Sequence, residues 1–235
     1  SKFTCMKTYF ITGTDTGVGK TAITAGLAGA MRKLGINVGI MKPIASGYPQ
    51  KTGYKSSDVA ILSEAAGIKD PEDLINPVFL PIPTSPYDAT KLLSVPVDMP
   101  MILTRLVKLR SLHDVLLIEG IGGIMTPITK NFFIADMIKA MTSDTIIVTR
   151  AGLGTLNHTV MTWKMCKDYD IKIRGLVINN FDEKGTAAEK NAPTTLYELT
   201  GINILGIIPF IKDFNKIEKM VEIVSKNIDV KNLIS

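Results

Sequence analysis

Short apolar segments alternate with longer segments of mixed polarity along most of the chain. The short segments are almost continuously apolar and rich in isoleucine, valine and leucine; they cover residues 7–12, 37–41, 115–119, 145–149, 173–179 and 203–208. Strands buried on both faces of a sheet have this composition, whereas strands with one solvated face alternate apolar and polar residues. The segments therefore predict strands of a parallel sheet that is covered on both sides.

The longer segments repeat apolar residues at the spacing of an α-helix. They cover residues 20–34, 58–66, 101–112, 132–141, 156–169 and 216–228. Strands that alternate with helices form βαβ units around a parallel sheet. The expected fold is a doubly wound α/β fold with a mainly parallel sheet. No shift in composition marks a boundary within residues 1–235, so a single domain is expected.

Residues 76–100 do not follow this alternation. The stretch contains six prolines, and each removes a main-chain donor and disfavours the interior of a helix. We therefore expect a long surface loop without regular helix. Long loops in compact domains are often functional.

A glycine-rich loop joins the first predicted strand to the first predicted helix. Its sequence is GTDTGVGKT at residues 13–21. Glycines let main-chain amides turn towards an anion, and the helix start adds the positive end of a dipole. The loop is a lengthened phosphate-binding loop, because one residue more than usual separates Gly13 from Gly19. We expect Lys20 to reach the β and γ phosphates of a nucleotide and the Thr21 hydroxyl to bind Mg²⁺.

Charged residues stand at the ends of two further predicted strands. Lys42 follows the second strand and Glu119 ends the third, and open α/β sheets bind ligands at the carboxyl ends of their strands. An ammonium group at Lys42 could stabilise the charge of a transferring phosphoryl group. Glu119 follows four apolar residues, where an unpaired carboxylate is costly, so a nearby Mg²⁺ would compensate it. Asp58 stands at a helix start, where capping alone would also explain it.

The composition narrows the classes of partner. The net charge of +5 is mild and not concentrated in a stripe, so we expect no nucleic-acid groove. We expect no membrane span and no signal peptide, because no apolar run reaches ~20 residues and residues 1–10 lack an apolar h-region and a small-residue cleavage site. Two cysteines are too few for a disulfide framework, which favours the cytoplasm. Met6 is a candidate natural start, with residues 1–5 added before it.

Four separated motifs together resemble the dethiobiotin synthase family: GTDTGVGKT at 13–21, KPIASG at 42–47, SSD at 56–58 and EGIGG at 119–123. Further similarity extends the resemblance over most of residues 7–210. The resemblance implies that 7,8-diaminononanoate, CO₂ and ATP give dethiobiotin, ADP and phosphate, through a carbamate and its mixed anhydride with phosphate. It also implies a homodimer whose active site lies at the subunit interface.

The resemblance assigns roles residue by residue. It implies catalytic roles for Lys20 and Lys42 and metal binding by Thr21, Asp58 and Glu119. It implies nucleotide binding by Gly17, Val18, Gly19, Lys20, Thr21, Ala22, Asp58, Glu119, Gly120, Ile121, Gly122, Asn179, Asn180, Ile208, Pro209 and Phe210. It implies substrate binding by Thr14, Ser46, Gly154 and Asn157, the last two from the partner subunit. The chain departs from the family at Ile121, where a small residue is usual, and at Asn180, where an acidic residue is expected.

Three alternatives are considered at this point. A nucleotide-driven switch or positioning ATPase would share the phosphate loop, but that class has a second lysine where this chain has Asp15. A GTPase is disfavoured because the segment from Asn179 to Asp182 lacks the lysine of a guanine motif. A P-loop ligase that acts on another amine or carboxylate is the harder alternative to separate.

Overall fold

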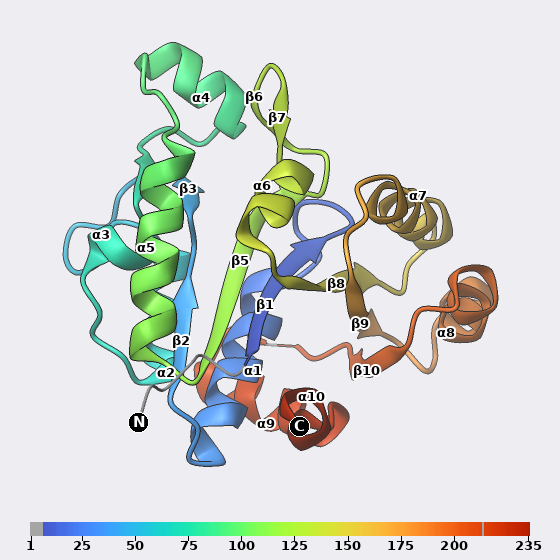
Figure 1. Cartoon of the computed structure of the whole chain (residues 1–235). Helices are drawn as coiled ribbons and strands as arrows, with labels where there is room; N and C mark the ends of the chain where they lie inside the picture. Colours follow the sequence, from blue (N-terminus) through green and yellow to red (C-terminus); the bar gives the residue numbers. More distant parts are fainter. Residues whose placement is uncertain (1–6, 213) are drawn as a thin grey trace.

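The computed structural model describes residues 7–212 and 214–235, so the prediction about residues 1–5 lies outside the described part. Its centre is a parallel six-stranded sheet in the order β10-β9-β8-β1-β5-β2 (Figure 1). The strands are β1 (Lys7–Gly13), β2 (Val38–Met41), β5 (Val115–Gly123), β8 (Asp144–Arg150), β9 (Ile173–Phe181) and β10 (Ile204–Pro209). All the strands predicted from the apolar segments are confirmed, with β5 extending furthest beyond its predicted end.

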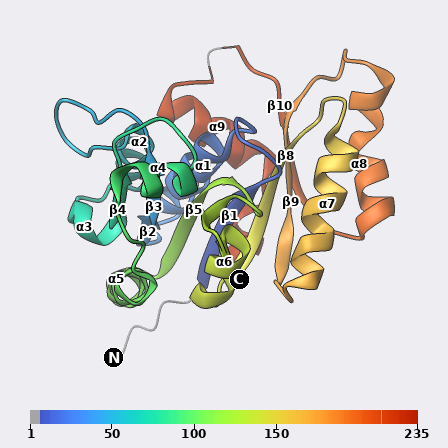
Figure 2. The same cartoon turned by 90° about the horizontal axis from the view of Figure 1, so that it is seen from above.

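Helices cover both faces of this sheet (Figure 2). One face carries α1 (Lys20–Lys33), α2 (Ser57–Ala66) and α9 (Ile217–Asn227), which pack against one another. The other face carries α5 (Met99–Leu112), α6 (Ile134–Met141), α7 (Thr155–Asp168) and α8 (Ala187–Thr200). The doubly wound α/β prediction is confirmed. Among the described residues, no helix combines the length and the apolar composition needed to cross a bilayer.

The sheet topology determines where a ligand can bind. The chain goes from β1 to β2 in one direction along the sheet, whereas β5, β8, β9 and β10 lead in the other direction. Helices that leave neighbouring strands on opposite faces open a crevice at the carboxyl ends of those strands. This switch point lies at β1, and the glycine-rich loop of residues 13–19 follows β1 directly.

The prediction of a long loop at residues 76–100 is wrong in part. The stretch contains β4 (Val78–Leu80), α4 (Pro86–Leu93) and the start of α5. Pro86 and Pro100 lie in the first turns of their helices, where no intrahelical bond needs their missing N–H. Ser85 and Asp98 cap these helices by accepting hydrogen bonds from main-chain N–H groups.

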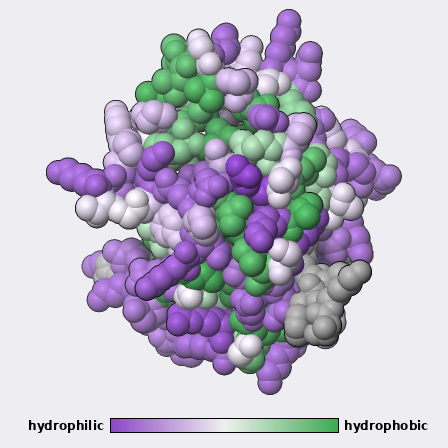
Figure 3. Space-filling view, turned by 60° about the vertical axis from the view of Figure 1, so that its left-hand side comes forward, coloured by the Kyte–Doolittle hydropathy of each residue, from purple (hydrophilic) through white to green (hydrophobic). Residues whose placement is uncertain are grey.

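Figure 3 shows hydrophobic surface at the upper end of the molecule, the end that carries α4 in Figure 1.

Other elements were not predicted from the apolar pattern. The helix α8 contains Pro193 and buries few residues, so its apolar pattern is weak. The short pieces are β3 (Ile44–Ser46), α3 (Glu72–Ile75), β6 (Pro127–Thr129), β7 (Phe132–Phe133) and α10 (Val230–Ile234). β3 pairs with β4 in parallel, and β6 pairs with β7 as a hairpin. The β3–β4 pair matters for the site, because β3 begins three residues after β2 ends at Met41 and pairs with β4 instead of with the central sheet.

Candidate active site

A cavity of about 250 Å³ lies at the carboxyl ends of β1, β2 and β5. Its lining consists of Thr16, Gly17, Gly19, Lys20, Thr21, Ala22, Lys42, Asp58, Glu119, Gly120, Ile121 and Gly122. Most of the residues expected to hold phosphates or Mg²⁺ are therefore brought together, although they come from four separate segments of the chain. Val18 belongs to the same loop, but its side chain is buried and does not line the cavity.

The glycine-rich loop takes a main-chain conformation that only glycine adopts easily. Gly17 and Gly19 have φ of 76° and 98°, in the left-handed region. A Cβ added at Gly19 would collide with the side-chain amide of Asn179, which donates to the Val18 carbonyl at 2.9 Å. The end of β9 thus supports the loop from below, and α1 starts at Lys20 without a side-chain cap.

We expect Gly19→Ala to lower nucleotide affinity by at least about tenfold, because the strained φ and the collision with Asn179 both displace the loop amides. The matched control is Gly35→Ala, since Gly35 also has a left-handed φ, 79°, but has open space around its Cβ position. Calorimetric titration with ATP analogues measures the affinities. Equal affinity losses in the two variants would contradict the proposed contact of this loop with phosphates.

Lys20 lies almost buried at the start of α1. Burial lowers its pKa below the usual value, and the positive charge of Lys42 acts in the same direction, whereas Glu119 opposes the shift. A buried ammonium group needs anionic partners. The phosphate oxygens of a nucleotide would supply them at this position.

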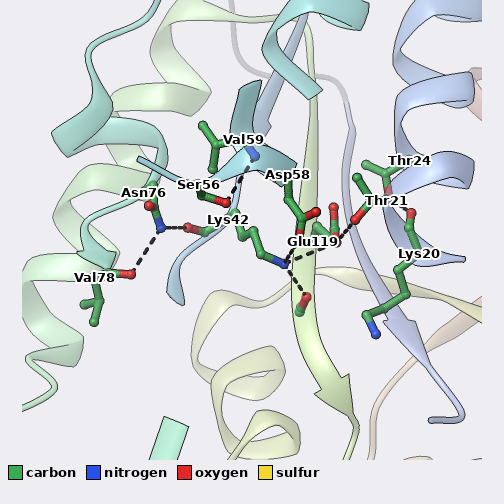
Figure 4. Close-up of polar contacts among 11 residues, drawn as sticks. Lys20, Thr21, Thr24, Lys42, Ser56, Asp58, Val59, Asn76, Val78 and Glu119 are labelled. Carbon is green, nitrogen blue, oxygen red and sulfur yellow. Dashed lines mark hydrogen bonds and ion pairs between the residues drawn. The ribbon is translucent and has the colours of Figure 1, made fainter. Parts of the chain in front are cut away.

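Glu119 connects the start of α1 with Lys42, because its side chain contacts both Thr21 and Lys42 (Figure 4). Its side chain is only about 2% exposed. Oε1 accepts a hydrogen bond from Thr21 Oγ1 at 2.7 Å and one from Lys42 Nζ at 3.2 Å. Oε2 is buried and has no partner among the described residues. A buried carboxylate oxygen without a partner is costly, so this atom marks a place for a further cation.

Lys42 contacts both carboxylates of the cavity. Its Nζ lies 3.2 Å from Glu119 Oε1 and 3.5 Å from Asp58 Oδ2, and it donates to the Gly120 carbonyl at 3.1 Å. Burial is the largest single influence on the pKa of Lys42 and acts to lower it. The charges of Glu119 and Asp58 and the hydrogen bonds that they accept together outweigh burial, so the pKa is raised. Lys42 therefore keeps its positive charge while buried.

The side chains present suit Mg²⁺. This ion prefers oxygen ligands, and it is commonly held by one or two carboxylates together with substrate phosphates and water. Thr21, Asp58 and Glu119 offer one hydroxyl and two carboxylates around one cavity, and the free Oε2 of Glu119 is the unfilled acceptor. The described residues contain no group of three or more His, Cys, Asp or Glu side chains placed to hold a metal ion. The oxygens of this cavity would thus hold the ion jointly with a nucleotide.

A larger cavity of about 670 Å³ lies beside the first and shares Thr16 with it. Thr14 lines this cavity, whereas Gly154 and Asn157 lie at the nearby start of α7. Its walls also include apolar residues of the β5–β6 connection and of α7, namely Ile124, Met125, Pro127, Val160, Met161 and Met165. Ser46 is half-buried at the end of β3 and lines neither cavity. The predicted substrate residues are thus distributed around the phosphate cavity rather than within it.

A cluster of threonines connects the glycine-rich loop with β8 and α7. Thr149, at the end of β8, lies 3.1 Å from Thr14 through their hydroxyl oxygens and 2.9 Å from both Thr155 and Thr159 of α7. This cluster could not be predicted from the sequence, because buried threonines at β8 and α7 carry no motif. Contacts between hydroxyl groups become visible only when the strand and the helix are packed together.

The residues predicted for the adenine pocket are split by burial. The Asn179 side chain is buried beneath the phosphate loop, and the Ile208 side chain is fully buried in the core. Asn180 is exposed, with a left-handed φ of 56°. Phe210 is 65% exposed, and its N–H donates to the Phe181 carbonyl, so the ends of β9 and β10 lie side by side. Because the Ile208 side chain is buried, this residue could face a base only through its main-chain atoms.

Comparisons with known proteins identify relatives of this chain by sequence and by fold. Residues 7–218 match a family described as an AAA domain. The chain is 52% identical to the ATP-dependent dethiobiotin synthetase BioD of Nitrosopumilus maritimus, over 97% of this chain and all of the relative. It is 41% identical to the protein of the same name from Thermodesulfovibrio yellowstonii, over 97% of this chain and 98% of the relative.

Solved structures with a similar fold include cell division proteins. The MinC:MinD cell division protein complex of Aquifex aeolicus matches with a TM-score of 0.61 and 15% identity, over 97% of this chain and 96% of the other. The MinD cell division ATPase of Pyrococcus furiosus matches with a TM-score of 0.57 and 17% identity, over 97% and 99%. At this identity the likeness concerns the fold alone.

Proposed function

The chain belongs to the family of ATP-dependent dethiobiotin synthetases, and we propose from this that it converts 7,8-diaminononanoate, CO₂ and ATP into dethiobiotin, ADP and phosphate. It is an ATP-dependent ligase that closes a ring in biotin biosynthesis. The observation that best supports the proposed chemistry is the buried, charged Lys42 beside Glu119, in the cavity that the phosphate loop also lines.

The proposed reaction has three steps. One amine of the diamine adds to CO₂ and loses a proton, which gives a carbamate. A carbamate oxygen then attacks the γ phosphorus of ATP, and ADP leaves with the electrons of the broken P–O bond. The second amine attacks the carbonyl carbon of the resulting mixed anhydride and loses a proton to solvent, the ureido ring closes, and phosphate leaves with the electrons of the broken C–O bond. Negative charge develops on oxygen in the second and third steps, which is where fixed positive charge lowers the barrier.

The roles of the residues follow from this charge. Lys20 and the amides of residues 17–22 would bind the β and γ phosphates, and Lys42 would stabilise the carbamate and the transferring phosphoryl group. Thr21, Asp58 and Glu119 would hold Mg²⁺, which neutralises phosphate charge when bound. Gly120, Ile121 and Gly122 would lie against the γ phosphate. Asn179, Asn180 and the 208–210 segment would border the adenine.

We propose a homodimer as the acting form, with the substrate between two subunits. Support comes from the apolar cavity beside the phosphate site and from Leu153 and Met161, which are large, apolar and exposed on or near α7. Gly154 and Asn157 of one subunit would bind the carboxylate of a substrate held mainly by Thr14 and Ser46 of the other. A cytoplasmic location is part of the proposal and is supported by the low cysteine content.

The proposed function predicts phosphate release that depends on the diamine. Purified protein with Mg·ATP and bicarbonate should release phosphate only when 7,8-diaminononanoate is added, and ¹³C-bicarbonate should appear in the ureido carbon by mass spectrometry. An analogue with only one amine serves as the control, because it cannot close the ring. Equal phosphate release without the diamine would instead support an ATPase without ligase activity, and this chain shares the fold of a cell division ATPase.

A further inference from the structure

The main chain of Lys42 lies outside the regular hydrogen bonding of the central sheet. The β2–β5 ladder ends at Met41, paired with Ile118, and Pro43 follows Lys42. A residue before proline is restricted to extended conformations, but this alone does not satisfy its N–H and carbonyl groups. Some other segment must therefore hold Lys42 in place.

That segment is the α3–β4 connection. The Lys42 N–H donates to the Ile75 carbonyl at 2.7 Å. The side-chain amide of Asn76 donates to the Lys42 carbonyl at 2.8 Å and to the Val78 carbonyl at 3.1 Å (Figure 4). Lys42 is thus bound on both sides by neighbouring residues of one connection.

The side chain of Asn76 acts only as a hydrogen-bond donor among the described residues. The residue is only 4% exposed, and both hydrogens of its amide are used on carbonyls of two different segments. Its Oδ1 is buried and has no partner among the described residues. A buried amide that leaves its acceptor unpaired is retained at a cost, so the two donated bonds must matter to the arrangement.

The two donated bonds fix the point from which the Lys42 side chain starts. From there the ammonium group reaches Glu119, Asp58 and the Gly120 carbonyl, all at 3.1 to 3.5 Å. A shift of the main chain by a fraction of this distance would withdraw Nζ from the cavity. Misplacement of a catalytic group by about 1 Å can cost a factor of about 100 in rate.

We propose that Asn76 is a positioning residue for Lys42, which sets the direction of the ammonium group through the Lys42 carbonyl. This inference rests on the proposed catalytic role of Lys42. Asn76 itself does not line the phosphate cavity, so its effect on the reaction is exerted through Lys42 alone.

A double-mutant cycle tests the inference. Asn76→Ala should lower kcat by about 10- to 100-fold and leave the KM for ATP within about threefold. In a Lys42→Met background the same change should lower kcat by less than about threefold, because residues that act as one unit are not additive. If Asn76→Ala does not fold, Asn76→Ser takes its place, since its hydroxyl can still donate to one carbonyl.

Asn37→Ala is the matched control. Asn37 lies before the other end of β2, and its amide also donates to a main-chain carbonyl, that of Leu112 at 3.0 Å, but far from the cavity. This variant should keep kcat at the value of the unmodified protein. Full additivity of the Asn76 and Lys42 changes would overturn the positioning role while leaving the role of Lys42 intact. A Lys42→Met protein with unchanged kcat would remove the basis of both.

Discussion

Lys42→Met is expected to lower kcat by about 100- to 1000-fold while the KM for ATP changes little. This is the loss seen when one preorganised donor to a developing oxyanion is removed. Methionine has a similar length and apolar stem, so the variant removes the charge and the donors without opening a large cavity. A residue whose charge acts mainly in the transition state lowers kcat and kcat/KM together.

The structure explains why ATP binding should be spared. Lys42 contacts Glu119, Asp58 and the Gly120 carbonyl, whereas the loop amides and Lys20 lie on α1 and the segment before it. Steady-state kinetics with varied ATP and diamine measure the two constants. Lys51→Met is the control, since Lys51 is exposed in the connection between β3 and α2. A tenfold or larger rise in the KM for ATP with unchanged kcat would place Lys42 in ATP binding instead.

Much of this architecture could be predicted from the sequence, for a physical reason. Strands buried on both faces must be continuously apolar, so a charged residue that ends such a strand is conspicuous, as Glu119 is. The glycine-rich loop is similarly visible because a left-handed φ at Gly19 restricts the residue type. The sequence could therefore indicate which residues share the sheet edge before any contact was known.

What the sequence could not predict depends on contacts between distant segments. Asn76 follows a one-turn helix and precedes a proline, so a turn residue is all that its local pattern indicates. Its bond to the carbonyl of Lys42 lies just beyond the end of β2, between segments that are 34 residues apart in the sequence. The helix α4 is hidden by its proline for another reason: Pro86 lies in the first turn, where proline is tolerated, although proline disfavours the interior of a helix.

Glu119→Gln is expected to raise the Mg²⁺ concentration required for half-maximal activity by at least about tenfold, and to lower kcat strongly. Glutamine keeps the shape and can still accept from Thr21, but it removes the negative charge that faces Lys42 and that would attract Mg²⁺. Breaking a buried ion pair by neutralising one partner also costs about 3 to 5 kcal/mol of stability. Mg²⁺ titrations of the rate at fixed ATP, with thermal unfolding of the metal-free protein, measure the two effects.

Asp58→Asn provides the comparison that isolates burial. The Asp58 side chain is 41% exposed and that of Glu119 only 2%, although both lie within 3.5 Å of Lys42 Nζ. An exposed carboxylate is screened by water, so removing its charge should cost less than about 1 kcal/mol of stability. Its effect on the Mg²⁺ requirement should still be measurable, because the variant removes one of the two carboxylate charges that would hold the ion. If Glu119→Gln altered stability but left the Mg²⁺ requirement unchanged, Glu119 would be only the counter-ion of Lys42, and the metal would have to be held elsewhere.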